Sequence, residues 1–363
     1  MINVTKAYLP PIDEYTKYLE GIWERVHLTN HGPLVSELEQ KLKDYLGVKH
    51  LFFVNNGTIA IQIAIKAMEL KGEIITTPFS YVATTSSIVW ENCTPVFVDI
   101  DPDNFTIDAS KIEAAITERT TGILATHVYG IPCDVNAIEA IAKKHGLRVI
   151  YDAAHAFGVK CYDKSILNYG DMSTLSFHAT KLFHTVEGGA IITNNDELAH
   201  RIGYMRNFGH KGQEDFWGMG INGKSSEFHA AMGLCMLPQV ENIMTTRKTL
   251  SDAYEKNFHE LGIKLFRPRV NNECYYNYAY YPVVFENETQ LLMVRDSLNA
   301  AYIYPRRYFY PSLNTLPYLQ QAGKMQVSES IASRVLCLPL YHDLSVENIR
   351  RICTIIAEVL KYR

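Results

Sequence analysis

The chain lacks the features of a membrane protein or a nucleic-acid-binding protein. Its 363 residues contain no uninterrupted apolar run near the roughly 18 residues that a spanning helix needs. Lysine and arginine number 35 against 39 aspartates and glutamates, a net charge of −4, and no basic run is concentrated anywhere. A mildly acidic chain without a basic face attracts nucleic acid weakly. We therefore expect neither a membrane-spanning segment nor a nucleic-acid partner.

Cysteine is sparse, and its spacing argues against the usual cysteine-based sites. The seven cysteines are scattered, none belongs to a CxxC pair, and their number is odd. Such spacing suits neither a disulfide framework nor a zinc site. The N-terminus also lacks a basic stretch followed by an apolar run, so it does not resemble a secretion signal. The sequence predicts reduced thiols, no metal site and a cytoplasmic protein.

Internal repeats and low-complexity segments are absent as well, and the first two-thirds of the chain alternates short apolar runs with helical stretches. Strands that are apolar throughout are typical of a sheet covered on both faces, and their alternation with helices favours a mainly parallel sheet. The expected strands are 50–54, 73–76, 95–98, 122–126, 148–151 and 190–193. The expected helices among them are 58–69, 82–90, 109–116, 135–145 and 197–205.

Both ends of the chain also carry helical patterns. Apolar residues at helical spacing predict helices at 12–26, 34–45 and 240–261. Beyond these, the tyrosine-rich stretch 275–281 is expected to form a strand, and helices are expected at 328–335 and 346–360. We predict an α/β fold with a large domain, residues 1–243, built on a mostly parallel sheet between helices. Residues 244–363 are expected to form a smaller α+β domain.

Three motifs could form a binding or catalytic site. The first is Asn55-Asn56-Gly57-Thr58, between an expected strand and an expected helix. Thr58 can cap the helix, and the free N–H groups of a helix start, together with the helix dipole, favour an anion. Taken alone, such a junction is more often an ordinary helix cap.

The second and third motifs carry an acid and an amine. Asp152 ends an expected parallel strand, where open α/β sheets bind ligands, although an aspartate there can also simply cap a helix. Lys181 ends the run Ser176-Phe177-His178-Ala179-Thr180-Lys181, shortly before Glu187-Gly188-Gly189. A desolvated lysine can form a Schiff base, whereas most lysines are merely solvated. Together the three motifs meet the needs of pyridoxal 5′-phosphate: an anion cradle, an acid for the ring nitrogen and a lysine for the aldehyde.

These motifs resemble those of the DegT/DnrJ/EryC1/StrS family of sugar aminotransferases, within the fold-type I pyridoxal-phosphate enzymes. The resemblance runs almost end to end and rests on eight short motifs in the family's order. They are Leu28-Thr29-Asn30-His31-Gly32-Pro33, Asn56-Gly57-Thr58, Pro95-Val96-Phe97-Val98-Asp99-Ile100-Asp101, His127-Val128-Tyr129-Gly130, Asp152-Ala153-Ala154-His155-Ala156, Ser176-Phe177-His178-Ala179-Thr180-Lys181, Glu187-Gly188-Gly189 and Arg206-Asn207-Phe208-Gly209-His210.

The resemblance implies a role for each matching residue. Lys181 would hold the cofactor covalently and move a proton during catalysis. Asp152 would pair with the pyridinium nitrogen. Gly57, Thr58 and Ser176 would bind the phosphate.

Three further positions match residues that surround the cofactor in the family. Tyr81 falls where an aromatic ring stacks on the pyridine, although a tyrosine there can also pack in a core. His155 falls beside the cofactor's O3′. Asn222 matches an asparagine that reaches the phosphate of the neighbouring subunit, which implies a homodimer with shared active sites. Asn before Gly is also a common turn.

The resemblance also implies the reaction. Lysine at 181 separates aminotransferases from related sugar dehydratases, which have histidine there. Glutamate would donate the amino group, and a keto group on a nucleotide-linked hexose would receive it, with Lys181 as acid and base. Runs 76–90 and 178–184 resemble the subgroup that converts dTDP-4-keto-6-deoxyglucose to dTDP-4-amino-4,6-dideoxyglucose for O-antigen biosynthesis. C3-aminating members share the core motifs and remain the alternative.

The sugar nucleotide is anionic, so cationic and aromatic side chains are expected along its path. Lys224, Arg306 and Arg307 are candidates for the phosphates, and Tyr310 for the base or sugar. Each charge could equally be a solvated surface group, and Tyr310 could belong to a core. A regulator that senses pyridoxal phosphate is a distant alternative, disfavoured by the missing basic face.

Overall fold

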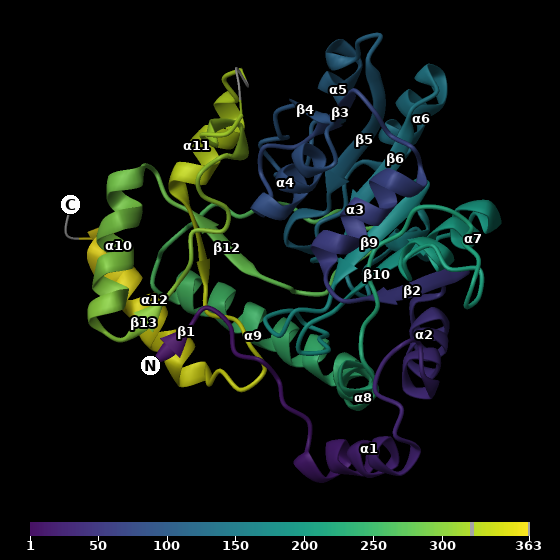
Figure 1. The fold of residues 1–363 in the computed structure, drawn as a ribbon. Coiled ribbons are helices and arrows are strands. Elements are labelled where there is room, and N and C mark those ends of the chain that lie inside the picture. Colours follow the sequence, from purple (N-terminus) through teal and green to yellow (C-terminus); the bar gives the residue numbers. More distant parts are fainter. Residues whose placement is uncertain (320–322, 362–363) are drawn as a thin grey trace.

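A seven-stranded sheet forms the centre of the computed structural model, which describes residues 1–319 and 323–361 (Figure 1). The strand order is β2-β10-β9-β6-β5-β3-β4. β10 is antiparallel to both of its neighbours, and the remaining pairs are parallel, which confirms the predicted mostly parallel sheet. The strands are β2 (His50–Val54), β3 (Glu73–Thr76), β4 (Thr94–Phe97), β5 (Thr120–Thr126), β6 (Arg148–Asp152), β9 (Met172–Ser176) and β10 (Gly189–Thr193).

Helices cover both faces of this sheet, and this explains why its strands are apolar throughout. Successive side chains of a strand point to opposite faces. In β6, Val149 and Tyr151 join the core beneath α2 (Pro33–Leu46), α6 (Val135–His145) and α8 (Glu227–Met236), whereas Ile150 joins the core beneath α3 (Gly57–Ala67), α4 (Val82–Trp90) and α7 (Asp196–Met205). The short α5 (Ala109–Ile112) packs beside α6.

The C-terminal part has a separate core. Its helices are α9 (Val240–Glu260), α10 (Glu288–Ala300), α11 (Gln326–Arg334) and α12 (Val346–Lys361), and its strands β12 (Tyr281–Val284) and β14 (Val335–Leu338) pair antiparallel. The N-terminal β1 (Ile2–Asn3) pairs with β13 (Ile303–Tyr304), so Ile2 packs in this core. The predicted boundary between residues 243 and 244 falls inside α9, and the division into two domains stays a prediction.

The tyrosine-rich stretch departs from its expected structure. Instead of one strand over 275–281, β11 (Cys274–Tyr275) pairs with β7 (Lys160–Cys161), which also pairs with β8 (Lys164–Ser165), and β12 begins only at Tyr281. Between β11 and β12, the Asn277 side chain binds backbone carbonyls of the large sheet's loops, which draws this segment out of a strand. The helix predicted at 328–335 ends one residue too late, because α11 ends at Arg334 and Val335 already pairs with Val284.

Helix α8 and strand β9 were not anticipated. Eight of the ten residues of α8 are buried, so the helix shows no alternation of polar and apolar faces that periodicity could detect. Strand β9, Met172-Ser173-Thr174-Leu175-Ser176, contains three hydroxyl residues and therefore lacks the apolar run expected of a buried strand.

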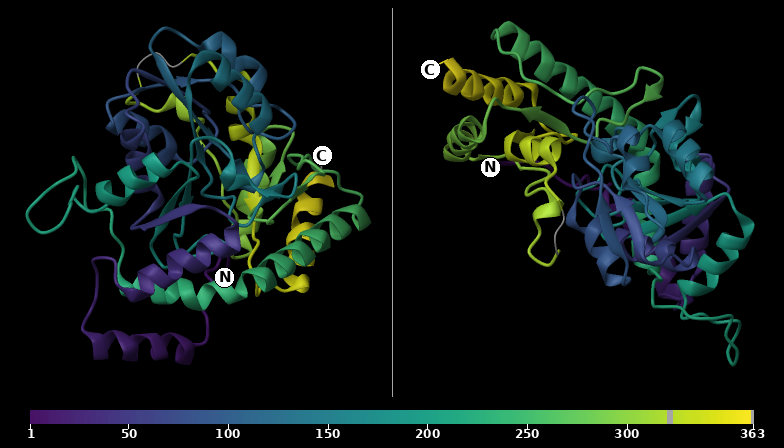
Figure 2. Two further views of the ribbon diagram at one scale, coloured as in Figure 1. Left: turned by 90° about the vertical axis from the view of Figure 1, so that its right-hand side faces the viewer. Right: turned by 90° about the horizontal axis from the view of Figure 1, so that it is seen from above.

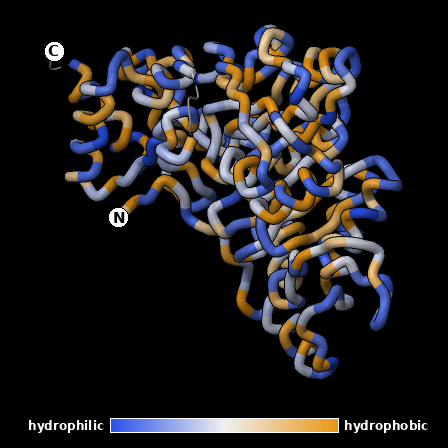
Figure 3. Tube along the Cα trace, turned by 45° about the horizontal axis from the view of Figure 1, so that its top comes forward, coloured by the Kyte–Doolittle hydropathy of each residue, from blue (hydrophilic) through white to orange (hydrophobic). Residues whose placement is uncertain are grey.

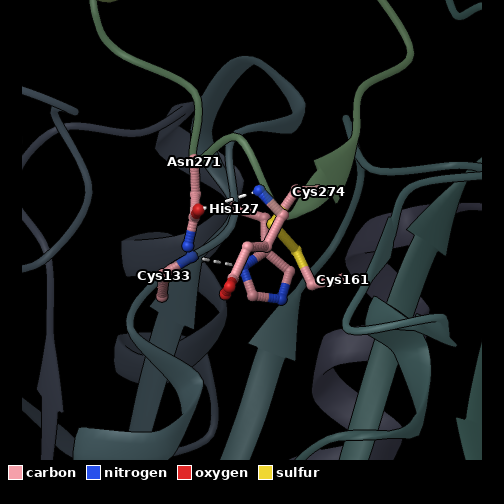
Figure 4. Close-up of a disulfide and its surroundings, with 6 residues drawn as sticks. His127, Cys133, Cys161, Asn271 and Cys274 are labelled. Carbon is pink, nitrogen blue, oxygen red and sulfur yellow. Dashed lines mark hydrogen bonds between the residues drawn. A yellow bond between two sulfur atoms is a disulfide. The ribbon is translucent and has the colours of Figure 1, made fainter.

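A disulfide joins Cys161 to Cys274, 113 positions apart (Figure 4). The prediction of reduced thiols is wrong for this pair. The antiparallel register of β7 and β11 sets the two residues opposite each other, with Cα atoms 4.1 Å apart, well inside the roughly 7 Å beyond which two cysteines cannot be bridged. This pairing is tertiary, so sequence spacing could not reveal it. Cys93, Cys133, Cys235, Cys337 and Cys353 are free and buried.

The disulfide predicts the number of reactive thiols in the denatured protein. We expect five thiols per chain, those of the free cysteines, to react with a thiol reagent in guanidinium without reductant. Prior reduction should raise the number to the seven cysteines of the sequence. Seven reactive thiols without reductant would show that Cys161 and Cys274 are not bonded.

Hydrophobic segments gather where strands and helices pack together, and hydrophilic segments lie toward the outer edges (Figure 3). Two features project from the body: α1 (Ile12–Arg25) and the loop between α7 and α8 (Figure 2). Within residues 1–319 and 323–361, no helix combines the length and apolar character needed to cross a bilayer.

Candidate active site

One cavity of about 390 Å³ lies where the carboxyl ends of β6 and β9 meet the amino ends of α3 and α4. In open α/β sheets this edge is where ligands bind. The C-terminal part of the chain closes the cavity with Tyr280, Arg306, Tyr308 and Phe309. Two other hollows measure about 690 Å³ each, but neither contains a buried lysine or histidine among its lining residues.

The cavity brings together most of the residues that the sequence predicted for the site. Those that line it are Gly57, Thr58, Tyr81, Asp152, His155, Ser176, Lys181 and Arg306. Asn222, Lys224 and Tyr310 do not line it within a single chain. Lys224 lies with His31 and Arg206 in a separate hollow of about 180 Å³.

The start of α3 leaves backbone N–H groups free toward the cavity. The N-cap is Asn56, not Thr58: the Asn56 Oδ1 accepts a hydrogen bond of 2.8 Å from the N–H of Ile59. The N–H groups of Gly57 and Thr58 precede the first bonds inside the helix and remain available to an anion. Thr58 is exposed, so its hydroxyl is available as well.

Two glycines make this anion cradle possible. A Cβ at Gly57 would lie 3.0 Å from the Cβ of Ser176 and would fill the space between the helix start and the Ser176 side chain. A Cβ at Gly189 would approach the carbonyl oxygen of Asn56 to 2.6 Å, so glycine there lets the turn before α3 rest on β10. Gly189, the last residue of the motif Glu187-Gly188-Gly189, is thus required for the shape of the cradle.

Asp152 is a buried carboxylate without a cationic partner among the described residues. Its Oδ2 accepts a 2.7 Å hydrogen bond from Thr84 and its Oδ1 accepts one of 3.1 Å from the N–H of Ala154. A chain of hydroxyls supports Thr84: Thr126 donates to Ser80, which lies 2.7 Å from Thr84. Burial raises the pKa of Asp152, and the bonds from Thr84 and Ala154 offset part of that rise. A cationic ring nitrogen in the cavity would supply the missing partner.

Lys181 is the matching cation without a carboxylate partner. Its Nζ donates a hydrogen bond of 3.3 Å to the hydroxyl of Tyr280, and no acidic group of the described chain forms an ion pair with it. Burial lowers the pKa of Lys181 to about 8, against the opposing charges of Asp152 and Tyr81. A larger share of this amine is therefore neutral and nucleophilic near neutral pH than of an ordinary lysine.

His155 is held as a neutral hydrogen-bond donor to the cavity. Its Nδ1 accepts a hydrogen bond of 3.1 Å from the N–H of Tyr129, so in the neutral ring the proton lies on Nε2. Burial, and then the charge of Lys181, hold the pKa of His155 well below its usual range. The ring stacks on Phe309, with centroids 5.5 Å apart.

Tyr81 is 58% exposed, which excludes the alternative that it packs in a core of the single chain. It lines the cavity immediately before α4, with its ring 6.4 Å from that of Phe309. Sequence reasoning missed Tyr280 as a site residue, because it reaches the cavity from the C-terminal part through tertiary contacts.

The chain is similar to known aminotransferases over nearly its whole length. Residues 12–357 match the model of the DegT/DnrJ/EryC1/StrS aminotransferase family. A dTDP-4-amino-4,6-dideoxy-D-glucose transaminase from Shigella dysenteriae is 42% identical over 366 residues, which cover 99% of each chain, and one from Escherichia coli is 40% identical, over 97% of this chain and 96% of that protein. The crystal structure of DesI in the presence of its TDP-sugar product superposes with a TM-score of 0.94 at 30% identity, covering 100% of this chain and 94% of that one.

Proposed function

The chain belongs to the DegT/DnrJ/EryC1/StrS family and is an aminotransferase, and we propose that it uses pyridoxal 5′-phosphate to transfer the amino group of glutamate to dTDP-4-keto-6-deoxyglucose. The product is dTDP-4-amino-4,6-dideoxyglucose, the compound named in the two relatives at 42% and 40% identity. One observation carries the cofactor part of the proposal: an unpaired buried carboxylate, an amine of lowered pKa and an anion cradle face the same cavity.

The residues present fit this cofactor at each of its functional groups. Gly57, Thr58 and Ser176 supply donors for the phosphate. Asp152 holds the proton on the ring nitrogen, and the Nε2–H of His155 donates to the ring oxygen. Tyr81 offers its ring to one face of the pyridine. When bound, the cofactor supplies an electron sink that makes the α-proton of glutamate acidic.

Lys181 does the work of proton transfer in this proposal. Its neutral amine would accept the α-proton of glutamate and return a proton to C4′ of the cofactor, and in the second half of the reaction it would move the proton in the reverse direction. Because its pKa lies near 8, it is close to the working pH and can act both as base and, once protonated, as acid.

For the sugar nucleotide, Arg306 is the best-placed cation. It lines the cavity, is exposed and has no ion-pair partner among the residues described. Arg307 is instead bound to Glu288 at 2.7 Å and lies over the ring of Tyr310, 3.5 Å from its centroid. Arg306 therefore supports the diphosphate in this proposal, while Arg307 and Tyr310 stabilise the adjacent loop.

The test of this function is product formation with a small panel of substrates. Purified protein loaded with the cofactor is incubated with glutamate and with either dTDP-4-keto-6-deoxyglucose or its 3-keto isomer. The proposal expects the 4-amino product from the first, identified by mass and NMR. Amination of the 3-keto sugar alone would establish the C3 alternative, and no amination of either sugar would refute the assigned substrate.

We also propose that two copies of the chain share their active sites. The projecting α1 exposes Ile12 and Trp23, at 74% and 68%, and the loop before α8 exposes a group of apolar side chains, Phe208, Phe216, Trp217, Met219 and Ile221. Such a concentration of exposed apolar groups is typical of an interface. Asn222 follows these residues in the same loop, so a partner subunit that covers the loop can receive Asn222 at its own phosphate cradle.

Shared sites predict that two inactive variants complement each other. Asn222→Ala is expected to lower activity about tenfold or more, through a lost hydrogen bond to a charged group. A heterodimer of Lys181→Ala and Asn222→Ala chains has one site in which both residues are intact, so it should recover about half of the wild-type activity. The measurement uses co-expressed chains with two different tags, purified in sequence.

The control pairs Lys181→Ala with a chain that carries both substitutions, and this dimer should stay inactive. A heterodimer of the single variants with no more than about half the activity of Asn222→Ala would mean that Asn222 serves its own chain's cavity. Failure to isolate any heterodimer would contradict the dimer itself.

A further inference from the structure

Segment 276–280, between β11 and β12, places Tyr280 against Lys181 and His155, two of the titratable groups that line the cavity with Asp152. The Tyr280 hydroxyl accepts a hydrogen bond of 3.3 Å from Lys181. Its ring stands edge-on to the imidazole of His155, with centroids 4.9 Å apart and planes at 71°. The hydroxyl thus lies at the amine that carries the proposed proton transfer.

Asn277 fixes the backbone of this segment. It is fully buried, and its amide nitrogen donates to the carbonyl oxygens of His155 and Phe157, at 2.8 and 2.9 Å. Its side-chain oxygen accepts a hydrogen bond of 3.1 Å from the N–H of Ala279. Asn277 therefore ties the residues before Tyr280 to the loop that contains His155.

Arg247 of α9 holds the same segment from the other side. It is 4% exposed, and its Nη1 donates a hydrogen bond of 3.0 Å to the carbonyl of Ala279. Its Nε has no hydrogen-bond partner, and no carboxylate in the described chain pairs with it. Burial lowers the pKa of Arg247 to about 10, so it stays charged at neutral pH. A buried guanidinium without an anion is costly and unusual for a contact that only supports the fold.

Tyr280 keeps its proton under working conditions. Burial raises the pKa of its hydroxyl, and the charge of Arg247 offsets only part of that rise. A protonated hydroxyl can accept a hydrogen bond from a charged amine and can donate one to a neutral amine. The contact between Tyr280 and Lys181 can therefore persist in both protonation states of the lysine.

We propose that Tyr280 is a positioning residue for Lys181, held in place by Asn277 and Arg247, an inference that rests on the proposed function. Each half of the reaction frees the Lys181 amine, which must then stay within reach of the proton that it moves. The Tyr280 hydroxyl holds the free amine toward the cavity before and after it takes up that proton. Tyr280 itself neither gains nor loses a proton overall.

The test is Tyr280→Phe, which removes the hydroxyl and keeps the ring. Glutamate is mixed with the cofactor-loaded protein without sugar, and the change in cofactor absorbance is followed over a single turnover. We expect the maximal rate to fall on the order of 10- to 100-fold, while the half-saturating glutamate concentration changes less than about twofold. The rate at which apoprotein captures added pyridoxal phosphate should fall as well, and this second readout does not depend on turnover.

Two further variants complete the experiment. Tyr276→Phe is the matched control, because the Tyr276 hydroxyl donates to the carbonyl of Tyr129 and does not line the cavity; both rates should stay at the wild-type level. Arg247→Met removes an unpaired buried charge, which the fold tolerates, and should lower both rates in the same direction as Tyr280→Phe.

The outcomes distinguish a failure of the positioning role from a failure of the proposed function. Wild-type rates in Tyr280→Phe, or an equal loss in Tyr276→Phe, would overturn the positioning role. Wild-type protein whose bound cofactor does not respond to glutamate would refute the proposed function instead. If Tyr280→Phe did not fold, the rates of Arg247→Met would test the positioning role instead: lowered rates would support it, and wild-type rates would overturn it.

Discussion

Lys181→Ala is expected to lower amino transfer by at least about four orders of magnitude, because it removes both the cofactor's attachment and the group that moves the proton. No other lysine lines the cavity. The fold should persist, since the lost amine has no carboxylate partner within residues 1–319 and 323–361, and its removal leaves no acid unpaired. Steady-state turnover, with the thermal unfolding midpoint measured beside it, checks both statements.

Attachment can be measured separately from turnover. After borohydride reduction, the wild-type protein should carry the mass of one covalent cofactor per chain, and Lys181→Ala should carry none. Lys143→Ala is the control, since Lys143 is an exposed residue of α6 remote from the cavity lining; it should label and turn over normally. Substantial turnover in Lys181→Ala would refute the assigned role.

Asp152→Asn is expected to lower the maximal rate on the order of 100- to 10,000-fold and to weaken cofactor binding. The substitution keeps the size of the side chain and removes the charge that stabilises a protonated ring nitrogen. The hydroxyl chain from Thr126 through Ser80 to Thr84 can reverse its donors, so the new amide nitrogen can donate to Thr84. The loss should therefore appear in the chemistry rather than in the fold.

The same variant should make the cofactor-free protein more stable at neutral pH. Burial raises the folded-state pKa of Asp152, so its ionisation is harder in the folded protein than in the unfolded chain. Stability linked to this group is complete below its unfolded pKa of about 3.9 and is lost as the pH rises through the raised folded pKa. The unfolding free energy of the apoprotein should thus be higher for Asp152→Asn than for wild type at pH 7, and the difference should shrink near pH 4.

Asp134→Asn serves as the control for both measurements. Asp134 caps α6 by accepting from the N–H of Ala137, and asparagine caps a helix as well as aspartate. The maximal rate and the unfolding free energy of Asp134→Asn at pH 7 should match those of the wild-type protein. If Asp152→Asn turned over normally, Asp152 would not be the partner of the ring nitrogen.

Local sequence patterns were enough to predict those helices and strands whose side chains alternate or repeat regularly between buried and exposed positions, or are apolar throughout. Strands β2 and β3 and helix α6 occupy the residues that the sequence pattern predicted, because each lies in a regular apolar or amphipathic run. Helix α8 escaped prediction because nearly every one of its positions is buried. The strand predicted at 275–281 was wrong for a different reason. The Asn277 side chain donates hydrogen bonds to carbonyl groups far away in the sequence, and such contacts leave no local periodicity.

The residues of the candidate site also fall into two groups, those that the sequence indicated and those that only the structure reveals. Gly57 follows a predicted strand and Asp152 ends one, and the combined needs of pyridoxal phosphate linked Lys181 to them. Tyr280 lines the cavity and Arg247 binds the carbonyl of Ala279 beside it, and both do so only because the C-terminal part packs against the sheet. Their contribution depends on three-dimensional contacts between segments that no spacing rule relates.

The pairing of β1 with β13 also has a consequence for biosynthesis. Ile2 aligns with Ile303, and the carbonyl of Val4 accepts a hydrogen bond of 3.0 Å from Leu340. During translation, residues 2–4 must wait for some 300 further residues to emerge from the ribosome before they find their partners. The large sheet can form in the meantime, whereas the second core cannot close until synthesis is nearly finished, so a nascent chain arrested before residue 303 would hold its N-terminal segment exposed to proteases.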